Sequence, residues 1–165
     1  MVTLLAPHPL RVLIADGNPG IRDGLVSFLR HLSAATRIHQ VQDGRMALAA
    51  LSKDVYDLIV TELDMDGGSG EAFMKHLMAS KLLRHKATIV YSNKEFDDGP
   101  YDNIIYINKT LTPIAELERI IKELVFKNFI CPRCPESIAG GPCNDICFYT
   151  HLDQKWRSKV REFLA

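Results

Sequence analysis

Residues 56–70 constrain the fold of this chain more than any other stretch. The stretch opens with the apolar run Leu58-Ile59-Val60, which is short and β-branched enough to be a buried strand of a parallel sheet. It then becomes polar, with carboxylates at Glu62, Asp64 and Asp66 and glycines at 67, 68 and 70. A buried strand that ends in carboxylates and a glycine-rich turn is typical of the carboxyl edge of an open α/β sheet, where such sheets place their sites.

The rest of the chain up to about residue 129 alternates strand-like and helix-like segments. Short apolar runs predict strands at 10–15, 35–41, 58–63, 87–92 and 103–108, and helical spacing of apolar residues predicts helices at 21–32, 45–52, 70–82 and 113–129. This alternation with short connections predicts a doubly wound parallel sheet of five strands. Residues 93–102 leave too little chain for a normal helical crossover, so we expect the fourth helix to be shortened, irregular or missing.

Polar residues mark where three of these helices should begin. Asp43 is a candidate N-cap for the second helix, and Ser69 is a candidate cap for the third. Thr112 followed by Pro113 predicts the start of the last one, because a hydroxyl suits the N-cap and proline suits the first helical position.

The bulk composition narrows the functional classes. The 165 residues suffice for one α/β domain with a small appendage, and 20 basic against 20 acidic residues give no net charge that would attract nucleic acid or a membrane surface. The amino-terminal residues lack the features of a signal peptide, and no apolar run approaches the length of a membrane helix. We therefore expect a cytoplasmic protein.

The cysteines gather in a segment of their own, residues 130–165, which we interpret as a separate module. Cys131, Cys134, Cys143 and Cys147 lie within seventeen residues, and this clustering in a reducing compartment favours a metal over disulfides. A structural zinc ion held by the four cysteines is the leading interpretation, and His151 is an alternative fourth ligand. Free thiols, disulfides and an iron–sulfur cluster stay open.

The same segment predicts a final helix. Leu152, Trp156, Val160 and Phe163 recur at helical spacing, among scattered basic residues. Five basic and four acidic residues in the segment are too balanced for a nucleic-acid surface, so packing or partner binding is the favoured interpretation.

Over residues 9–129 the chain resembles the receiver (CheY-like) domain of two-component response regulators. The resemblance rests on the order and spacing of several motifs: Leu-Ile-Ala-Asp16-Gly-Asn-Pro, Gln-Asp43-Gly-Arg-Met-Ala-Leu, Asp57-Leu-Ile-Val-Thr-Glu62, Met65-Asp-Gly-Gly-Ser-Gly70, Ser92 and Lys109. It implies a flavodoxin-like sheet with the strand order 2-1-3-4-5.

The resemblance also implies roles for particular residues. In that family two acidic residues after strand one and an aspartate after strand three bind magnesium, and this aspartate accepts a phosphoryl group. When these roles are transferred to this sequence, the site comprises Asp16, Ser92 and Lys109, with Glu62 at the phosphoacceptor position. Tyr106 stands at the position of the switch aromatic, the strand-five residue that changes rotamer in this family.

Four departures from the family pattern put phosphorylation in doubt. Gly17 stands in place of the second acid, Glu62 in place of the phosphoacceptor aspartate, and Asp66 and Thr110 in place of usual prolines. The extra methylene of Glu62 displaces its carboxylate by about 1 Å, and a misplacement of that size can cost on the order of 10²-fold in rate. Because Mg²⁺ requires near-octahedral oxygen ligands, we expect it to bind weakly or not at all.

The leading hypothesis is therefore a non-catalytic pseudo-receiver that signals through protein–protein contacts, independently of phosphorylation. Its partners would be signalling proteins, such as a histidine kinase, an output protein or a second copy of the chain, with no membrane or nucleic-acid partner. The alternatives are a phosphorylatable response regulator of a phosphorelay and a transcriptional regulator that binds DNA through the zinc tail. Glu62 can also simply pair with Lys109 to neutralise a buried charge.

Overall fold

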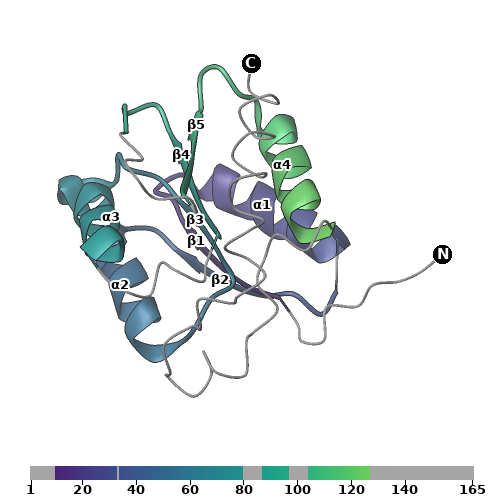
Figure 1. Ribbon diagram of the computed structural model, residues 1–165, viewed down its shortest axis with the longest axis horizontal. Coiled ribbons are helices and arrows are strands. Elements are labelled where there is room, and N and C mark those ends of the chain that lie inside the picture. The colour runs from purple at the N-terminus through teal and green to yellow at the C-terminus, as the bar shows by residue number, and fades with distance from the viewer. Residues whose placement is uncertain (1–9, 33, 80–86, 97–103, 127–165) are drawn as a thin grey trace, which may run out of the picture.

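The computed structural model describes residues 10–32, 34–79, 87–96 and 104–126, and these residues form a three-layer α/β sandwich (Figure 1). Five parallel strands make one sheet in the order β2-β1-β3-β4-β5, as the resemblance implied. The strands are β1 (Arg11–Ala15), β2 (Arg37–Val41), β3 (Leu58–Thr61), β4 (Ala87–Ser92) and β5 (Ile104–Asn108). Because all five strands are parallel, their carboxyl ends meet at one edge of the sheet.

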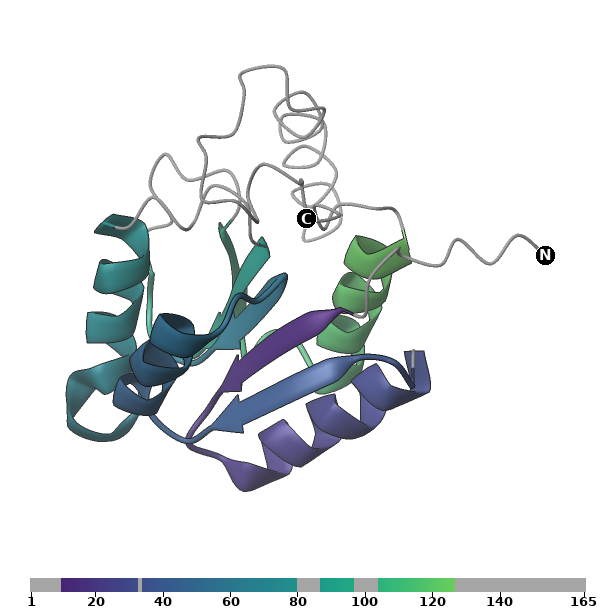
Figure 2. The same cartoon turned by 90° about the horizontal axis from the view of Figure 1, so that it is seen from below.

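Helices cover both faces of the sheet (Figures 1 and 2). Helices α1 (Pro19–Leu32) and α4 (Ile114–Phe126) lie on one face, and α2 (Gly44–Lys53) and α3 (Ser69–Ala79) lie on the other. A short 3₁₀ turn, η1 (Asp66–Gly68), leads into α3, and the left-handed backbone of Gly67 and Gly68 makes its tight reversal possible.

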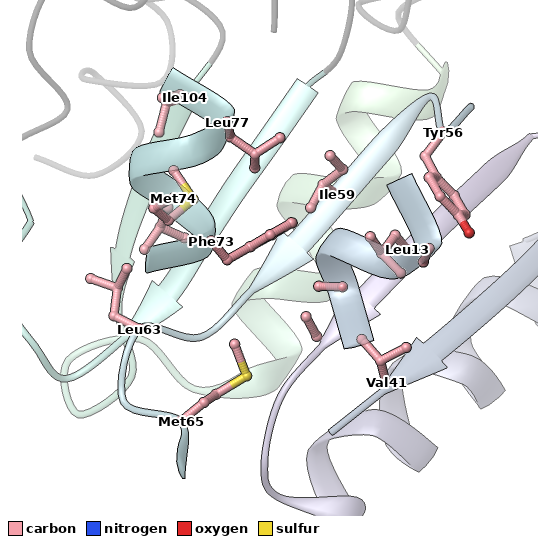
Figure 3. Packing of buried hydrophobic residues seen from close by; sticks show 14 residues of the cluster. Leu13, Val41, Tyr56, Ile59, Leu63, Met65, Phe73, Met74, Leu77 and Ile104 are labelled. Carbon is pink, nitrogen blue, oxygen red and sulfur yellow. The ribbon is translucent and has the colours of Figure 1, made fainter. Parts of the chain in front are cut away.

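Each face of the sheet has its own hydrophobic core, because successive strand residues point to opposite faces. On the α1–α4 face the alternate residues Val12 and Ile14 of β1 pack with Leu25 and Leu29 of α1. On the α2–α3 face Leu13 packs in a cluster with Phe73, which is fully buried (Figure 3). Strands buried on both faces explain why their sequences are continuous apolar runs rather than alternating ones.

Of the three predicted helix starts, the structure confirms the one at α2 and corrects those at α3 and α4. The Asp43 carboxylate accepts a hydrogen bond from the Met46 backbone N–H at 2.8 Å, which confirms it as the N-cap of α2. Ser69 does not cap α3, because it is the first residue of that helix and its hydroxyl oxygen accepts a hydrogen bond from the Gly44 N–H at 3.0 Å. Helix α4 starts at Ile114, one residue later than predicted from Pro113.

Other differences concern the ends of elements and the parts outside the described residues. Strand β3 stops at Thr61, two residues earlier than predicted, since the Glu62 side chain binds the N–H groups of the next two residues. Residues 93–96 form no helix, and the remainder of the predicted short fourth helix and the whole segment 130–165 fall outside the described residues. In the described part, no helix is long and apolar enough to span a membrane.

Candidate functional site

Four of the predicted site residues lie at or directly after the carboxyl ends of four neighbouring strands. Asp16 comes directly after β1 and Glu62 directly after β3, while Ser92 ends β4 and Lys109 follows β5. The parallel pairing of β1 with β3 extends one residue beyond Thr61, because the Glu62 N–H donates to the Ala15 carbonyl oxygen at 2.8 Å. In the same register, Asp16, Glu62 and Tyr91 lie side by side across β1, β3 and β4. The fold therefore brings together side chains that lie up to 93 positions apart in the sequence.

The Glu62 carboxylate is buried and both of its oxygens are engaged. Its Oε1 accepts hydrogen bonds from the backbone N–H groups of Leu63 at 2.7 Å and Asp64 at 3.0 Å. Its Oε2 accepts a hydrogen bond from the ammonium of Lys109. The extra methylene relative to aspartate thus lets the carboxylate curl over the start of its own loop while it reaches the lysine.

Lys109 joins the two buried carboxylates of the site. Its Nζ donates to Asp16 Oδ2 at 2.7 Å and to Glu62 Oε2, and only 17% of its side chain is exposed. The other oxygen of Asp16, Oδ1, accepts a hydrogen bond from the Asn18 N–H at 2.8 Å. Each of the four carboxylate oxygens therefore has at least one donor within the protein, which buried charges require.

The ion pair shifts the pKa values of both partners. Burial raises the pKa of the Glu62 carboxyl, but hydrogen bonds from Lys109 and Ser92 and from the Asp64 N–H outweigh it and hold the pKa below its ordinary value. Burial likewise lowers the pKa of Lys109, and its hydrogen bonds to Asp16 and Glu62 more than offset this and raise it. Both groups are therefore charged near neutral pH.

Ser92 and Tyr106 lie beside this cluster. The Ser92 side chain is fully buried, and its hydroxyl oxygen accepts a hydrogen bond from the Lys94 N–H at 3.1 Å. The Tyr106 hydroxyl donates to the Ser92 carbonyl oxygen at 3.4 Å, so it faces the end of β4. Asn108 Nδ2 in turn donates to this hydroxyl at 3.3 Å.

The acidic residues that could supplement the site do not converge with it. Asp64 and Asp66 are exposed, and Gly17 contributes no side chain. Within the described ranges no group of three histidine, cysteine or acidic side chains is placed to hold a metal ion. The two carboxylates that remain, Asp16 and Glu62, share the Lys109 ammonium, so these residues do not fit the magnesium site that the resemblance implies. The cysteines 131, 134, 143 and 147 and His151 lie outside the described residues.

Tyr91 is a neighbour of the site that the sequence analysis missed. Lys109 Nζ lies 5.4 Å from the centre of its ring. The strand registers contain the signal that could have found it, because Tyr91 occupies the β4 position level with Glu62 and opposite Ile107.

Comparison with known proteins identifies the fold and the family. The sequence model of the response regulator receiver domain family matches residues 12–99, which is just over half of the chain. The chain belongs to this family of receiver domains. It is thus a receiver domain of two-component signalling, whose partners are in general other signalling proteins. No curated protein sequence matches it.

Solved receiver structures resemble this receiver domain over most of their length. A CheY-like receiver from Methylobacillus flagellatus is 24% identical, with a TM-score of 0.55, and the match covers 70% of this chain and 98% of that one. The regulator TrrA of Thermotoga maritima, solved with Mg²⁺ and BeF, is 23% identical with a TM-score of 0.56, over 70% of this chain and 98% of that one. The phosphorylated cyanobacterial phytochrome response regulator RcpA is 20% identical, with a TM-score of 0.60, and the match covers 73% of this chain and 96% of that one. At these identities the likeness establishes the fold alone.

Proposed function

We propose that this chain is a pseudo-receiver, a non-catalytic cytoplasmic signalling module that acts through protein–protein contacts without taking up phosphate. The observation that carries the proposal is the Asp16–Glu62–Lys109 cluster, in which every carboxylate oxygen already has a donor. Phosphoryl transfer to a receiver needs a carboxylate oxygen free to attack in line and a metal to neutralise developing charge. In this site both carboxylates that could bind a metal are already paired with the Lys109 ammonium.

The position of the Glu62 charge supports a fixed signalling state. A carboxylate that reaches Lys109 supplies one unit of negative charge where a phosphoryl group would supply about two. The pair is thus a partial and permanent imitation of a phosphorylated site, held in place by the Leu63 and Asp64 N–H groups. The simpler alternative is that Glu62 only neutralises Lys109.

The face formed by β5 and α4 is the surface that we propose for the signalling partner. Leu111 lies in the turn between these elements and is 80% exposed, which is unusual for a large apolar side chain in the described part of the fold. Exposed apolar side chains at a surface with polar neighbours are common in protein contacts.

We further propose that the cysteine segment binds one structural zinc ion. The donors are Cys131, Cys134, Cys143 and Cys147, with His151 as the alternative to one of them, and four thiolates suit tetrahedral zinc. Metal analysis of the purified full chain tests this proposal, and zinc at about one ion per chain is the expected result. A chain that contains no zinc after preparation in zinc-supplemented medium would contradict it.

Exposure of the full chain to acetyl phosphate with Mg²⁺, read by intact mass, tests the pseudo-receiver proposal. We expect no phosphoryl adduct on the natural chain. The matched variant is the double substitution Gly17→Asp and Glu62→Asp, which restores both acids of the family pattern. A Cβ at position 17 would meet only the Gln42 carbonyl oxygen, at 3.8 Å, so there is room for the first change.

The two samples give distinct results. An adduct on the double variant alone would support the proposal, because it would show that Gly17 and Glu62 prevent the reaction in the natural chain. An adduct on the natural chain would overturn the proposal and favour the phosphorylatable alternative, and its location by peptide mapping would show whether Glu62 or Asp64 carries it.

A further inference from the structure

Tyr91 lies at the same level of the sheet as the charged cluster but belongs to none of the roles described above. Its side chain is buried, and β4 carries it on the α1–α4 face beside the position of Glu62. One buried tyrosine contacts two residues of the connection between β5 and α4. Its ring lies against the ammonium of Lys109, and its hydroxyl donates to the Thr112 carbonyl oxygen at 3.0 Å.

The ring contact restricts Lys109. A lysine side chain is flexible, and its ammonium has three N–H donors that can reorient. Two acceptors, Asp16 and Glu62, hold it from one side, while the Tyr91 ring at 5.4 Å attracts it electrostatically from another. A change in the charge of the cluster therefore changes the force on the ring.

The hydroxyl contact restrains the entry into α4. Thr112 lies two residues before Ile114, the first residue of the helix, and its own N–H donates to the Asn108 carbonyl oxygen at 2.9 Å. The next residue, Pro113, accepts the first helical hydrogen bonds, from the N–H groups of Glu116 and Leu117. The Tyr91 hydroxyl is thus bonded to the turn from which α4 starts.

We propose that Tyr91 is a positioning residue that couples the Asp16–Glu62–Lys109 cluster to the entry turn of α4. Removal of charge from the cluster loosens Lys109 against the ring and, through the Tyr91 hydroxyl, loosens residues 112–117. This coupling is a property of contacts within the fold, so it holds whether or not Glu62 can be phosphorylated. Tyr106 reaches the same turn by a different route, because its hydroxyl is bonded to Ser92 and Asn108, and the Asn108 carbonyl oxygen accepts the Thr112 N–H.

Amide hydrogen exchange on the full chain tests the coupling. The perturbation is Glu62→Gln, which removes one charge but keeps the shape, and the readout is the exchange rate at Thr112, Glu116 and Leu117 relative to α2. We expect exchange to become roughly three- to tenfold faster, the range that the net effect of one hydrogen bond implies. The same perturbation is then made with Tyr91→Phe, which keeps the ring and removes only the hydroxyl.

In the Tyr91→Phe background we expect Glu62→Gln to add almost no further change. The matched control is Tyr56→Phe, since Tyr56 is equally buried at 4% exposure and its hydroxyl is bonded to His39 on β2, away from the cluster. In that background the effect of Glu62→Gln should be the same as in the natural chain. Equal effects of Glu62→Gln with and without the Tyr91 hydroxyl would overturn the proposal, because the coupling would then bypass Tyr91, through the backbone between Lys109 and Thr112 or through Tyr106 and Asn108. No effect in the natural chain would also overturn it.

The ring contact has a test of its own. The NMR signal of the Lys109 ammonium should persist in Tyr91→Phe and broaden through faster proton exchange in Tyr91→Leu, which lacks the aromatic ring. A signal that is unchanged in Tyr91→Leu would show that the ring does not position Lys109.

Discussion

Three glycines near the charged cluster have different roles: Gly17 lies in the turn between β1 and α1, whereas Gly44 and Gly70 lie at the starts of α2 and α3. In the turn between β1 and α1, a Cβ on Gly17 would meet only the Gln42 carbonyl oxygen, at the ordinary contact distance of 3.8 Å. At the start of α3, a Cβ on Gly70 would lie 2.4 Å from the Leu63 carbonyl oxygen. A Cβ on Gly44, which packs on the same segment, would lie 1.9 Å from the carbonyl oxygen of Ser69.

The difference separates what the fold requires from what the chemistry requires. Backbone lies against Gly44 and Gly70, so no side chain fits there and the loop after β3 is held closely against α2. A Cβ on Gly17 would make only an ordinary contact, so the fold leaves room for the acid that the family pattern has at this position. The missing acid is therefore a change in the chemistry of the site within an otherwise ordinary receiver scaffold.

The largest expected effect is that of Gly44→Ala. The new methyl group would overlap the Ser69 backbone, and relief of the overlap would break the buried hydrogen bond from the Gly44 N–H to the Ser69 hydroxyl. We expect a loss of roughly 3 to 5 kcal/mol in the free energy of unfolding, measured by urea denaturation. Gly17→Ala is the matched control and should change it by less than about 1 kcal/mol. Similar losses in the two variants would remove the contrast between Gly17 and Gly44.

Lys109→Met should have the next largest effect. The substitution leaves Asp16 and Glu62 buried without their shared cation, and removal of one partner from a buried ion pair typically costs about 3 to 5 kcal/mol. The control is Lys94→Met, because Lys94 forms an ion pair with Glu71 on the exposed surface and should contribute little. Equal stability of the two variants would show that the cluster contributes no more than a surface pair.

The pH dependence of the free energy of unfolding should reveal how much ionised Glu62 contributes to stability. Its pKa in the folded chain lies below the ordinary value of 4.5, so the folded state binds the proton less tightly than the unfolded state. The stabilisation is therefore present above about pH 4.5 and is lost as the pH falls through the folded pKa. Lys109 has a raised pKa, so its contribution is present below about pH 10.5 and is lost at higher pH.

Comparison with Glu62→Gln isolates this effect. Between about pH 6 and 9 the difference in unfolding free energy between the natural chain and the variant should be constant, and it should shrink below about pH 4.5. The measurement is urea denaturation at a series of pH values. A difference that stays constant down to pH 3 would contradict the lowered pKa of Glu62.

The sequence predicted the scaffold better than the site, and particular residues show why. The continuous apolar strands and the Asp43 cap depend on local patterns, and their positions were right to within two residues. Helical spacing in residues 45–52 does not show which apolar side chains are buried: Met46 is 45% exposed, whereas Ala47 and Ala50 form the buried face of α2. Tyr91 was missed because its two contacts depend on the lateral order of the strands, which sequence spacing alone does not contain.

The smallest expected effect on stability belongs to Gly17→Asp, yet it should change the chemistry of the site most directly. The open space at position 17 allows the side chain, so the free energy of unfolding should stay within about 1 kcal/mol of the natural value. A third carboxylate near Asp16 and Glu62 should nevertheless attract Mg²⁺. One added charge at ~4 Å is worth on the order of 1 to 4 kcal/mol, so calorimetric titration should show an affinity at least about fivefold higher.

The matched variant for this titration is Gly17→Asn, which has nearly the same shape without the charge. It should bind Mg²⁺ little better than the natural chain does, because an amide oxygen adds a dipole but no net charge. Equal affinities of the aspartate and asparagine variants would mean that the Lys109 ammonium keeps the metal out even when the missing acid is restored. In that case Lys109, rather than Gly17, would be the residue that prevents magnesium binding, and the contrast between Gly17 and the helical glycines Gly44 and Gly70 would not account for the lost chemistry.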